Sequence, residues 1–88
     1  MQFEGAVVRE QNVVFGIVAV KPHVLNDPSR RQEMQLFGAR AFGAMPIALA
    51  TVDSRGVPTY YGRNDIVTFL SKVRVEAIPW RTYRIGAA

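Results

Sequence analysis

An apolar run covers residues 13–20, with the sequence VVFGIVAV, and Lys21-Pro22 follows it directly. The run has no polar side chain, is rich in β-branched residues and is too short to span a bilayer. These properties predict the central strand of a sheet that is covered on both faces. Gly16, inside the run, indicates either a bulge or the close approach of a packed helix.

A second β-prone segment, residues 3–9, precedes the apolar run and is separated from it by a short polar connection that contains Asn12. Such a connection between two β-prone segments indicates a hairpin, so we expect residues 3–9 to be an antiparallel partner of the central strand. The sequence leaves open whether this pairing occurs within the chain or across a dimer.

The next element is a helix that follows a polar loop at residues 23–27. Asp27 can accept hydrogen bonds from free backbone N–H groups, and Pro28 suits the first helical position. Leu36 falls on the polar side of this helix, either as a singly exposed residue or as a contact with another subunit. We expect Gly43 to end the helix in the left-handed conformation. The apolar residues recur at helical spacing: Met34, Phe37, Gly38 and Ala41.

Residues 46–52, with the sequence PIALATV, are apolar on both alternating faces and predict a second interior strand. A strand, helix and strand in succession imply a right-handed crossover, with the two strands parallel. Residues 53–56, DSRG, fit a type I turn, so the chain doubles back into an antiparallel strand at residues 57–61. Pro58 restricts that strand to an edge of the sheet.

A second helix begins near Asn64, which we expect to be its N-cap, with Asp65 in the first turn. After it, residues 80–85 alternate enough to form a short last strand, or an arm that reaches a neighbouring subunit. The buried stripe of this helix is expected to be Ile66, Phe69, Leu70 and Val73.

The predicted order is therefore ββαββα with an optional final strand. It indicates an α/β domain, with α+β as the alternative class, in which two helices pack on a mixed sheet of four or five strands. The chain has 88 residues, about half of them apolar, so we expect one small domain over residues 1–88.

Composition excludes several kinds of chemistry. The chain has no cysteine, which excludes disulfides, thiolate catalysis and Cys-based metal sites. It shows no signal peptide and no membrane-spanning run, so we expect a cytoplasmic protein with no membrane partner. The net charge is +4, with nine arginines and two lysines, which attracts polyanions in a general way.

One candidate site lies where the two predicted parallel strands end. A helix N-terminus and basic residues at this edge favour a phosphate or carboxylate ligand. The alternative is that these are solvated loop residues, with Asp53 making its turn and Asp27 its cap. The candidate ligand-binding residues are Lys21, His23, Arg30 and Arg55.

A second candidate surface mixes aromatic and basic side chains. Tyr or Trp beside Arg can stack a nucleic-acid base, but the same residue types also form lids over a core and protein–protein contacts. No motif typical of a nucleic-acid-binding domain supports the first interpretation. The residues are Tyr60, Tyr61, Arg63, Trp80, Arg81 and Tyr83.

The motifs of common enzymes are missing. The glycines are dispersed, so the sequence has neither a phosphate-binding loop nor a dinucleotide-binding fingerprint. A catalytic triad or a histidine metal site would have to use His23, the single histidine, and no serine stands in a nucleophile turn. The carboxylates are scattered singly, so we expect no metal, no other cofactor and no catalytic residue.

The function itself is not determined by the sequence. We expect a non-catalytic binding or interaction domain that self-associates, as a homodimer, and that can also have a protein partner. One alternative is a nucleic-acid or polyanion binder that uses the Arg and Tyr positions. The other is an enzyme that acts on a small anionic ligand at the edge formed by Lys21, His23 and Arg55.

Overall fold

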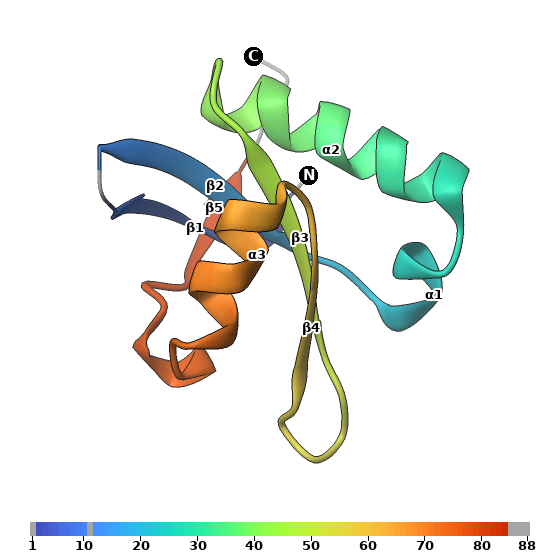
Figure 1. The fold of residues 1–88 in the computed structure, drawn as a ribbon. Coiled ribbons are helices and arrows are strands. Elements are labelled where there is room, and N and C mark those ends of the chain that lie inside the picture. Colours follow the sequence, from blue (N-terminus) through green and yellow to red (C-terminus); the bar gives the residue numbers. More distant parts are fainter. Residues whose placement is uncertain (1, 11, 85–88) are drawn as a thin grey trace.

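Five strands form one mixed sheet, in the order β4-β3-β2-β1-β5, and helices pack against both of its faces (Figure 1). This computed structural model describes residues 2–10 and 12–84. It confirms the predicted α/β class and the single small domain, and it includes the optional last strand; Ile85, the end of the range predicted for that strand, lies outside the described residues. The strands are β1 Gln2–Glu10, β2 Val13–Ala19, β3 Ile47–Val52, β4 Pro58–Tyr61 and β5 Arg81–Arg84.

The apolar run of residues 13–20 contains the central strand, as predicted. β2 pairs with β1 in the antiparallel direction and with β3 in the parallel direction. The β1–β2 pairing lies within the chain, and Asn12 supports the reversal between them with a φ of 67°. The register runs through Gly16 without a bulge. A Cβ at Gly16 would lie 2.6 Å from the ring of Phe42, so this glycine permits the close approach of a helix.

Each face of the sheet has its own helix. α2 lies over Val18, Ile47 and Leu49 on one face, and α3 lies over Phe15 and Ile17 on the other. Met34 and Gly38 of the first predicted stripe pack against one face of the sheet, and Ile66, Phe69 and Leu70 of the second belong to the cluster on the other face. Val73, predicted as the last residue of the second stripe, packs against the same cluster from beyond the end of α3. None of the described helices is both long and apolar enough to cross a membrane. The helical elements are α1 Pro22–Leu25, α2 Pro28–Phe42, α3 Asn64–Ser71 and the 3₁₀ turn η1 Val75–Ala77.

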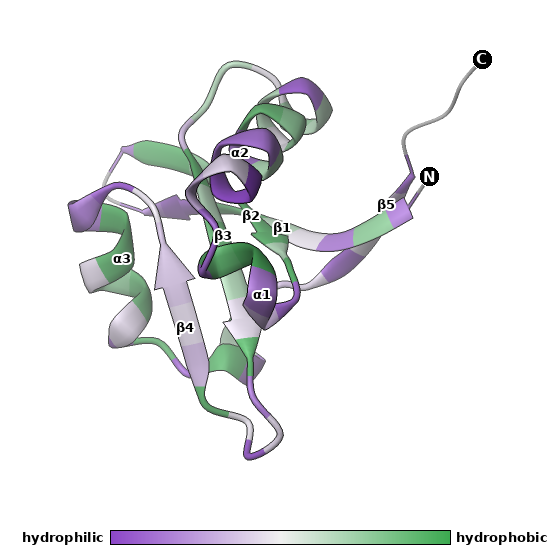
Figure 2. Ribbon diagram, turned by 90° about the vertical axis from the view of Figure 1, so that its right-hand side faces the viewer, coloured by the Kyte–Doolittle hydropathy of each residue, from purple (hydrophilic) through white to green (hydrophobic). Residues whose placement is uncertain are grey.

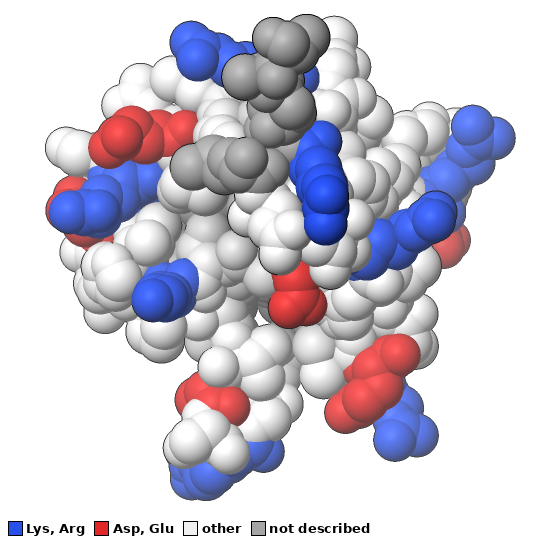
Figure 3. Space-filling view, turned by 180° about the vertical axis from the view of Figure 1, so that it is seen from behind, with Lys and Arg blue, Asp and Glu red and all other residues white. Residues whose placement is uncertain are grey.

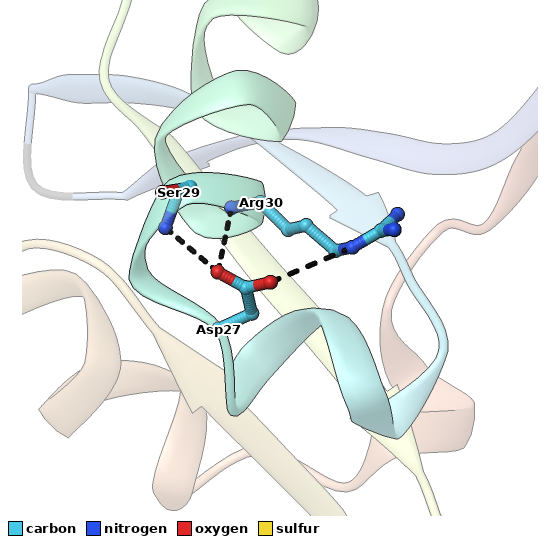
Figure 4. Close-up of polar contacts among 3 residues, drawn as sticks. All are labelled: Asp27, Ser29 and Arg30. Carbon is cyan, nitrogen blue, oxygen red and sulfur yellow. Dashed lines mark hydrogen bonds and ion pairs between the residues drawn. The ribbon is translucent and has the colours of Figure 1, made fainter.

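The start of α2 follows the prediction closely. The Oδ1 atom of Asp27 accepts hydrogen bonds from the backbone N–H groups of Ser29, at 3.0 Å, and Arg30, at 3.4 Å (Figure 4). Two of the helix's free donors are thereby satisfied. Gly43 ends α2 with a φ of 93°, although its ψ of −167° is extended rather than left-handed helical.

Two local predictions are wrong. The segment predicted as a polar loop contains the short helix α1, because Pro22 presets its first turn and the apolar residues Val24 and Leu25 are half-buried. Asn64 is not the N-cap of α3 but its first residue. Arg63 occupies the N-cap position, but its side chain does not hydrogen-bond to the free backbone groups of the helix. Its guanidinium instead donates two hydrogen bonds to the carboxylate of Asp65 in the first turn, with N–O distances of 2.8 and 2.7 Å.

Candidate binding surface

The four predicted ligand residues lie on three separate elements. Lys21 precedes α1, His23 lies within it, Arg30 is in the first turn of α2, and Arg55 is in the loop between β3 and β4. All four are exposed, and among the described residues no hydrogen bond or ion pair joins any two of them. Arg30 instead approaches its own cap residue, Asp27, at 3.6 Å.

The tyrosines and the arginine at the β4–α3 junction point in different directions. Tyr60 packs into the core beneath α3, whereas Tyr61 lies on the opposite face with the guanidinium of Arg31 at 4.5 Å from its ring centre. Arg63 is exposed, and its hydrogen bonds and charge lower the pKa of the Asp65 carboxyl to about 2. These side chains do not line a common site.

The aromatic residues near the C-terminus pack over the edge of the core. Trp80 is half-buried, and its indole N–H donates to the carbonyl of Val75 at 2.9 Å. Tyr83 stacks on Phe3, with ring centres 5.5 Å apart. Arg81, between them in sequence, remains exposed.

Several of the basic side chains lie beside carboxylates. Four arginines form ion pairs with nearby carboxylates, which reduces the field they can offer to a polyanion. Figure 3 shows Lys and Arg side chains spread around the face that it draws, several of them beside Asp or Glu and two of them adjoining at the right edge. The paired arginines are Arg30, Arg55, Arg63 and Arg74.

The surface that stands out is an apolar groove on the α3 side of the sheet, at the carboxyl ends of β2 and β3. Its volume is about 310 Å³. Ala19 and Ala50, paired across the two parallel strands, offer only methyl groups here, and Trp80 contributes a large aromatic side chain. We call this hollow the groove; its lining residues are Glu4, Ala19, Val20, Ala50, Thr51, Val52 and Trp80.

The groove exists because the helical cover on this face is short. α3 has eight residues, and its buried side chains Ile66 and Leu70 belong to the cluster that includes Phe15 and Ala48. The carboxyl ends of β2 and β3 therefore extend past α3. In open α/β sheets this end of the strands is where ligands most often bind.

A projecting hairpin borders the groove. The loop between β3 and β4 extends beyond the rest of the molecule in both views (Figures 1 and 2). The Oδ1 atom of Asp53 shapes its turn, because it accepts hydrogen bonds from the backbone N–H groups of Arg55, at 2.8 Å, and Val57, at 2.9 Å. Two valines of this hairpin are largely exposed, Val52 at 44% and Val57 at 54%.

A second hollow, of about 370 Å³, lies between the β1–β2 hairpin and α3. It is lined by charged as well as apolar groups, among them Glu10, Asp65 and Lys72. Asp65 is already engaged by Arg63. Among the described residues, no three His, Asp or Glu side chains are grouped so that they could hold a metal ion.

No family model matches the chain, and no curated protein or solved structure matches it either. Function is therefore inferred from the surface of the chain itself.

The sequence predicted Trp80 as a candidate interface residue and the polar residues near this edge as candidate ligand-binding residues, but it did not predict the other residues of the groove. Two signals were available: Ala19 and Ala50 stand near the ends of the runs that were predicted to be parallel, and Trp80 follows the helical segment. The missing information was which part of the sheet face the second helix leaves open, and that depends on tertiary packing.

Proposed function

We propose that this chain is a non-catalytic interaction domain that self-associates, and that two copies meet through the groove and the β3–β4 hairpin beside it. The observation that carries the proposal is the juxtaposition of an apolar hollow with a hairpin that exposes Val52 and Val57. Burial of apolar surface is the main driving force for protein association. A chain of 88 residues also has a small core, so association adds burial that it otherwise lacks.

The placement of the polar residues supports a binding role over a catalytic one. The single histidine, His23, is exposed on α1. A catalytic histidine is commonly oriented by a hydrogen bond to a neighbouring group. Among the described residues no hydrogen bond or ion pair involves His23.

The test is the mass of the full chain in solution, measured by light scattering over a range of concentrations. We expect the wild type to become a dimer as concentration rises and Val52→Asp to remain a monomer, because a carboxylate in an apolar contact is costly to desolvate. The matched control is Leu36→Asp, at a residue that is 57% exposed on α2, far from the groove in the fold. This control should dimerise like the wild type.

A wild-type chain that stays monomeric at high micromolar concentration would remove the proposal. Loss of the dimer in Leu36→Asp but not in Val52→Asp would move the interface to α2. Thermal melts followed by circular dichroism check that both variants are folded.

The polyanion alternative is tested in the same instrument by adding a pool of short DNA and RNA at low salt. A complex with the monomer that weakens steeply as salt is raised would favour that function. We expect no such complex at physiological salt, because a net charge of +4 is small and salt screens the attraction between exposed charges.

A further inference from the structure

The lining of the groove includes one charged residue. Glu4, on β1, contributes to the wall of an otherwise uncharged hollow, and it makes no ion pair with any described residue. Trp80 lines the same hollow and is held in place through its indole N–H. A carboxylate near an aromatic ring is the combination that binds a guanidinium or ammonium group.

The neighbouring hairpin carries such a group. The side chain of Arg55 is 84% exposed, near the tip of the loop. The carboxylate paired with it, Asp53, reaches it through Oδ2 at 3.8 Å, and a contact this long between two exposed side chains is weak. Arg55 is therefore available to an acceptor outside its own hairpin.

The shape of this region is self-complementary. Val52 is both part of the hairpin and part of the lining of the groove, so a projection and a hollow lie side by side on one chain. Two copies related by a two-fold axis can then each insert their hairpin into the groove of the other, which gives a closed dimer rather than a growing chain of copies.

The hairpin exposes a second apolar side chain besides Val52. Val57 directly precedes β4 and is 54% exposed, and its backbone carbonyl accepts a hydrogen bond from the N–H of Asp53 at 3.0 Å. Val52 and Val57 together give the hairpin apolar surface that a second copy can cover.

We propose that the occupant of the groove is the β3–β4 hairpin of a second copy of this chain, with Arg55 of each copy against Glu4 and Trp80 of the other. This inference rests on the proposed self-association and names its contact. The ion pair occurs twice in each dimer because the interface is symmetric. Its role is to fix the register of the two hairpins and to exclude other partners.

The decisive experiment exchanges the two charges. Glu4→Arg alone places two arginines at each contact, and Arg55→Glu alone places two carboxylates there. We expect each variant by itself to show a dimer dissociation constant raised about tenfold or more. An equimolar mixture of the two variants should recover dimers, because both contacts of the mixed dimer again join opposite charges. Native mass spectrometry identifies the mixed species.

The matched controls are Glu33→Arg and Arg40→Glu, which make the same charge changes at exposed positions of α2. Each should dimerise like the wild type, and their mixture should show no preference for the mixed dimer. This excludes an effect of net charge alone.

The possible results distinguish self-association in general from the specific contact between the hairpin and the groove. A monomeric wild type contradicts both the self-association and the hairpin contact. If the Trp80 emission of that monomer responds to benzylammonium, the groove binds a small organic cation instead. A wild-type dimer that Val52→Asp breaks, but that Glu4→Arg and Arg55→Glu leave at full affinity, retains self-association and overturns the hairpin contact. Mixed dimers that form in purely statistical proportion from variants of unchanged affinity overturn it as well.

Discussion

Tyr60 carries a polar group into the core. Its hydroxyl is shielded from solvent, and no described group of the chain lies within hydrogen-bond distance. Burial raises the pKa of this phenol, because the ionised form is poorly solvated there. A buried hydroxyl without a protein partner adds a desolvation cost to folding.

We therefore expect Tyr60→Phe to leave the protein as stable as the wild type or to stabilise it by about 1 kcal/mol, since the change removes an uncompensated polar group. Urea denaturation gives the free energy of unfolding. The control is Tyr61→Phe at the next residue, whose side chain is on the other face and exposed; it should change little. A loss of stability specific to Tyr60→Phe would show that the hydroxyl makes a favourable interaction.

The packing of α2 on the sheet depends on Gly38, the one residue of this helix that is fully buried. A Cβ at this position would lie 2.7 Å from a methyl group of Ile47 and 3.0 Å from one of Val18. The helix axis can lie this close to β2 and β3 because the side chain is absent.

Gly38→Val should destabilise the fold by about 2 kcal/mol, because the helix has to move away from the sheet and the overpacked side chains strain. The free energy of unfolding by urea measures this. Gln32→Val places the same β-branched residue on the exposed side of α2, where only its weaker helix propensity counts, and should cost about 0.5 kcal/mol or less. Equal losses in the two variants would contradict the close packing.

The sequence predicted the elements with long or periodic patterns and failed where the pattern was short. The apolar run of β2 and the spaced apolar residues of α2 and α3 each extend over several residues, so their positions and faces were predictable. α1 has only four residues, two of them half-buried, and such a segment has no period to detect. At the start of α3, Arg63 can bind Asp65, and this contact depends on side-chain geometry rather than on residue type.

The candidate site was harder to predict than the fold. The groove brings together residues that are far apart in the chain, from Glu4 on β1 to Trp80 before β5. A hollow is defined by what the neighbouring helix leaves uncovered, and residue patterns report which faces are apolar but not how far a helix extends over them.

At the scale of the whole molecule, the single tryptophan is a reporter of assembly. Trp80 lines the groove, and it is the one tryptophan of the chain. If the hairpin of a second copy occupies the groove, the indole loses contact with water when the dimer forms.

We expect the emission maximum of Trp80 to shift to shorter wavelength as the protein concentration rises, with the same midpoint as the dimer mass measured by light scattering. In Val52→Asp the spectrum should not depend on concentration. An unchanged emission maximum across a concentration range in which the dimer forms would place the interface away from the groove.

The order of the sheet also bears on how the chain folds. β5 pairs with β1, and the partners Phe3 and Tyr83 are separated by 80 positions in the sequence. Closing so long a loop is entropically costly until the intervening segments are compact, so this pairing is expected to form late. During synthesis, the backbone groups on one edge of β1 therefore remain unpaired until residues 81–84 have left the ribosome. In that interval the edge of β1 is exposed to pairing with other chains. β5 then covers residues 2–5 of β1 and presents instead a short edge that carries the charged residues Arg81 and Arg84.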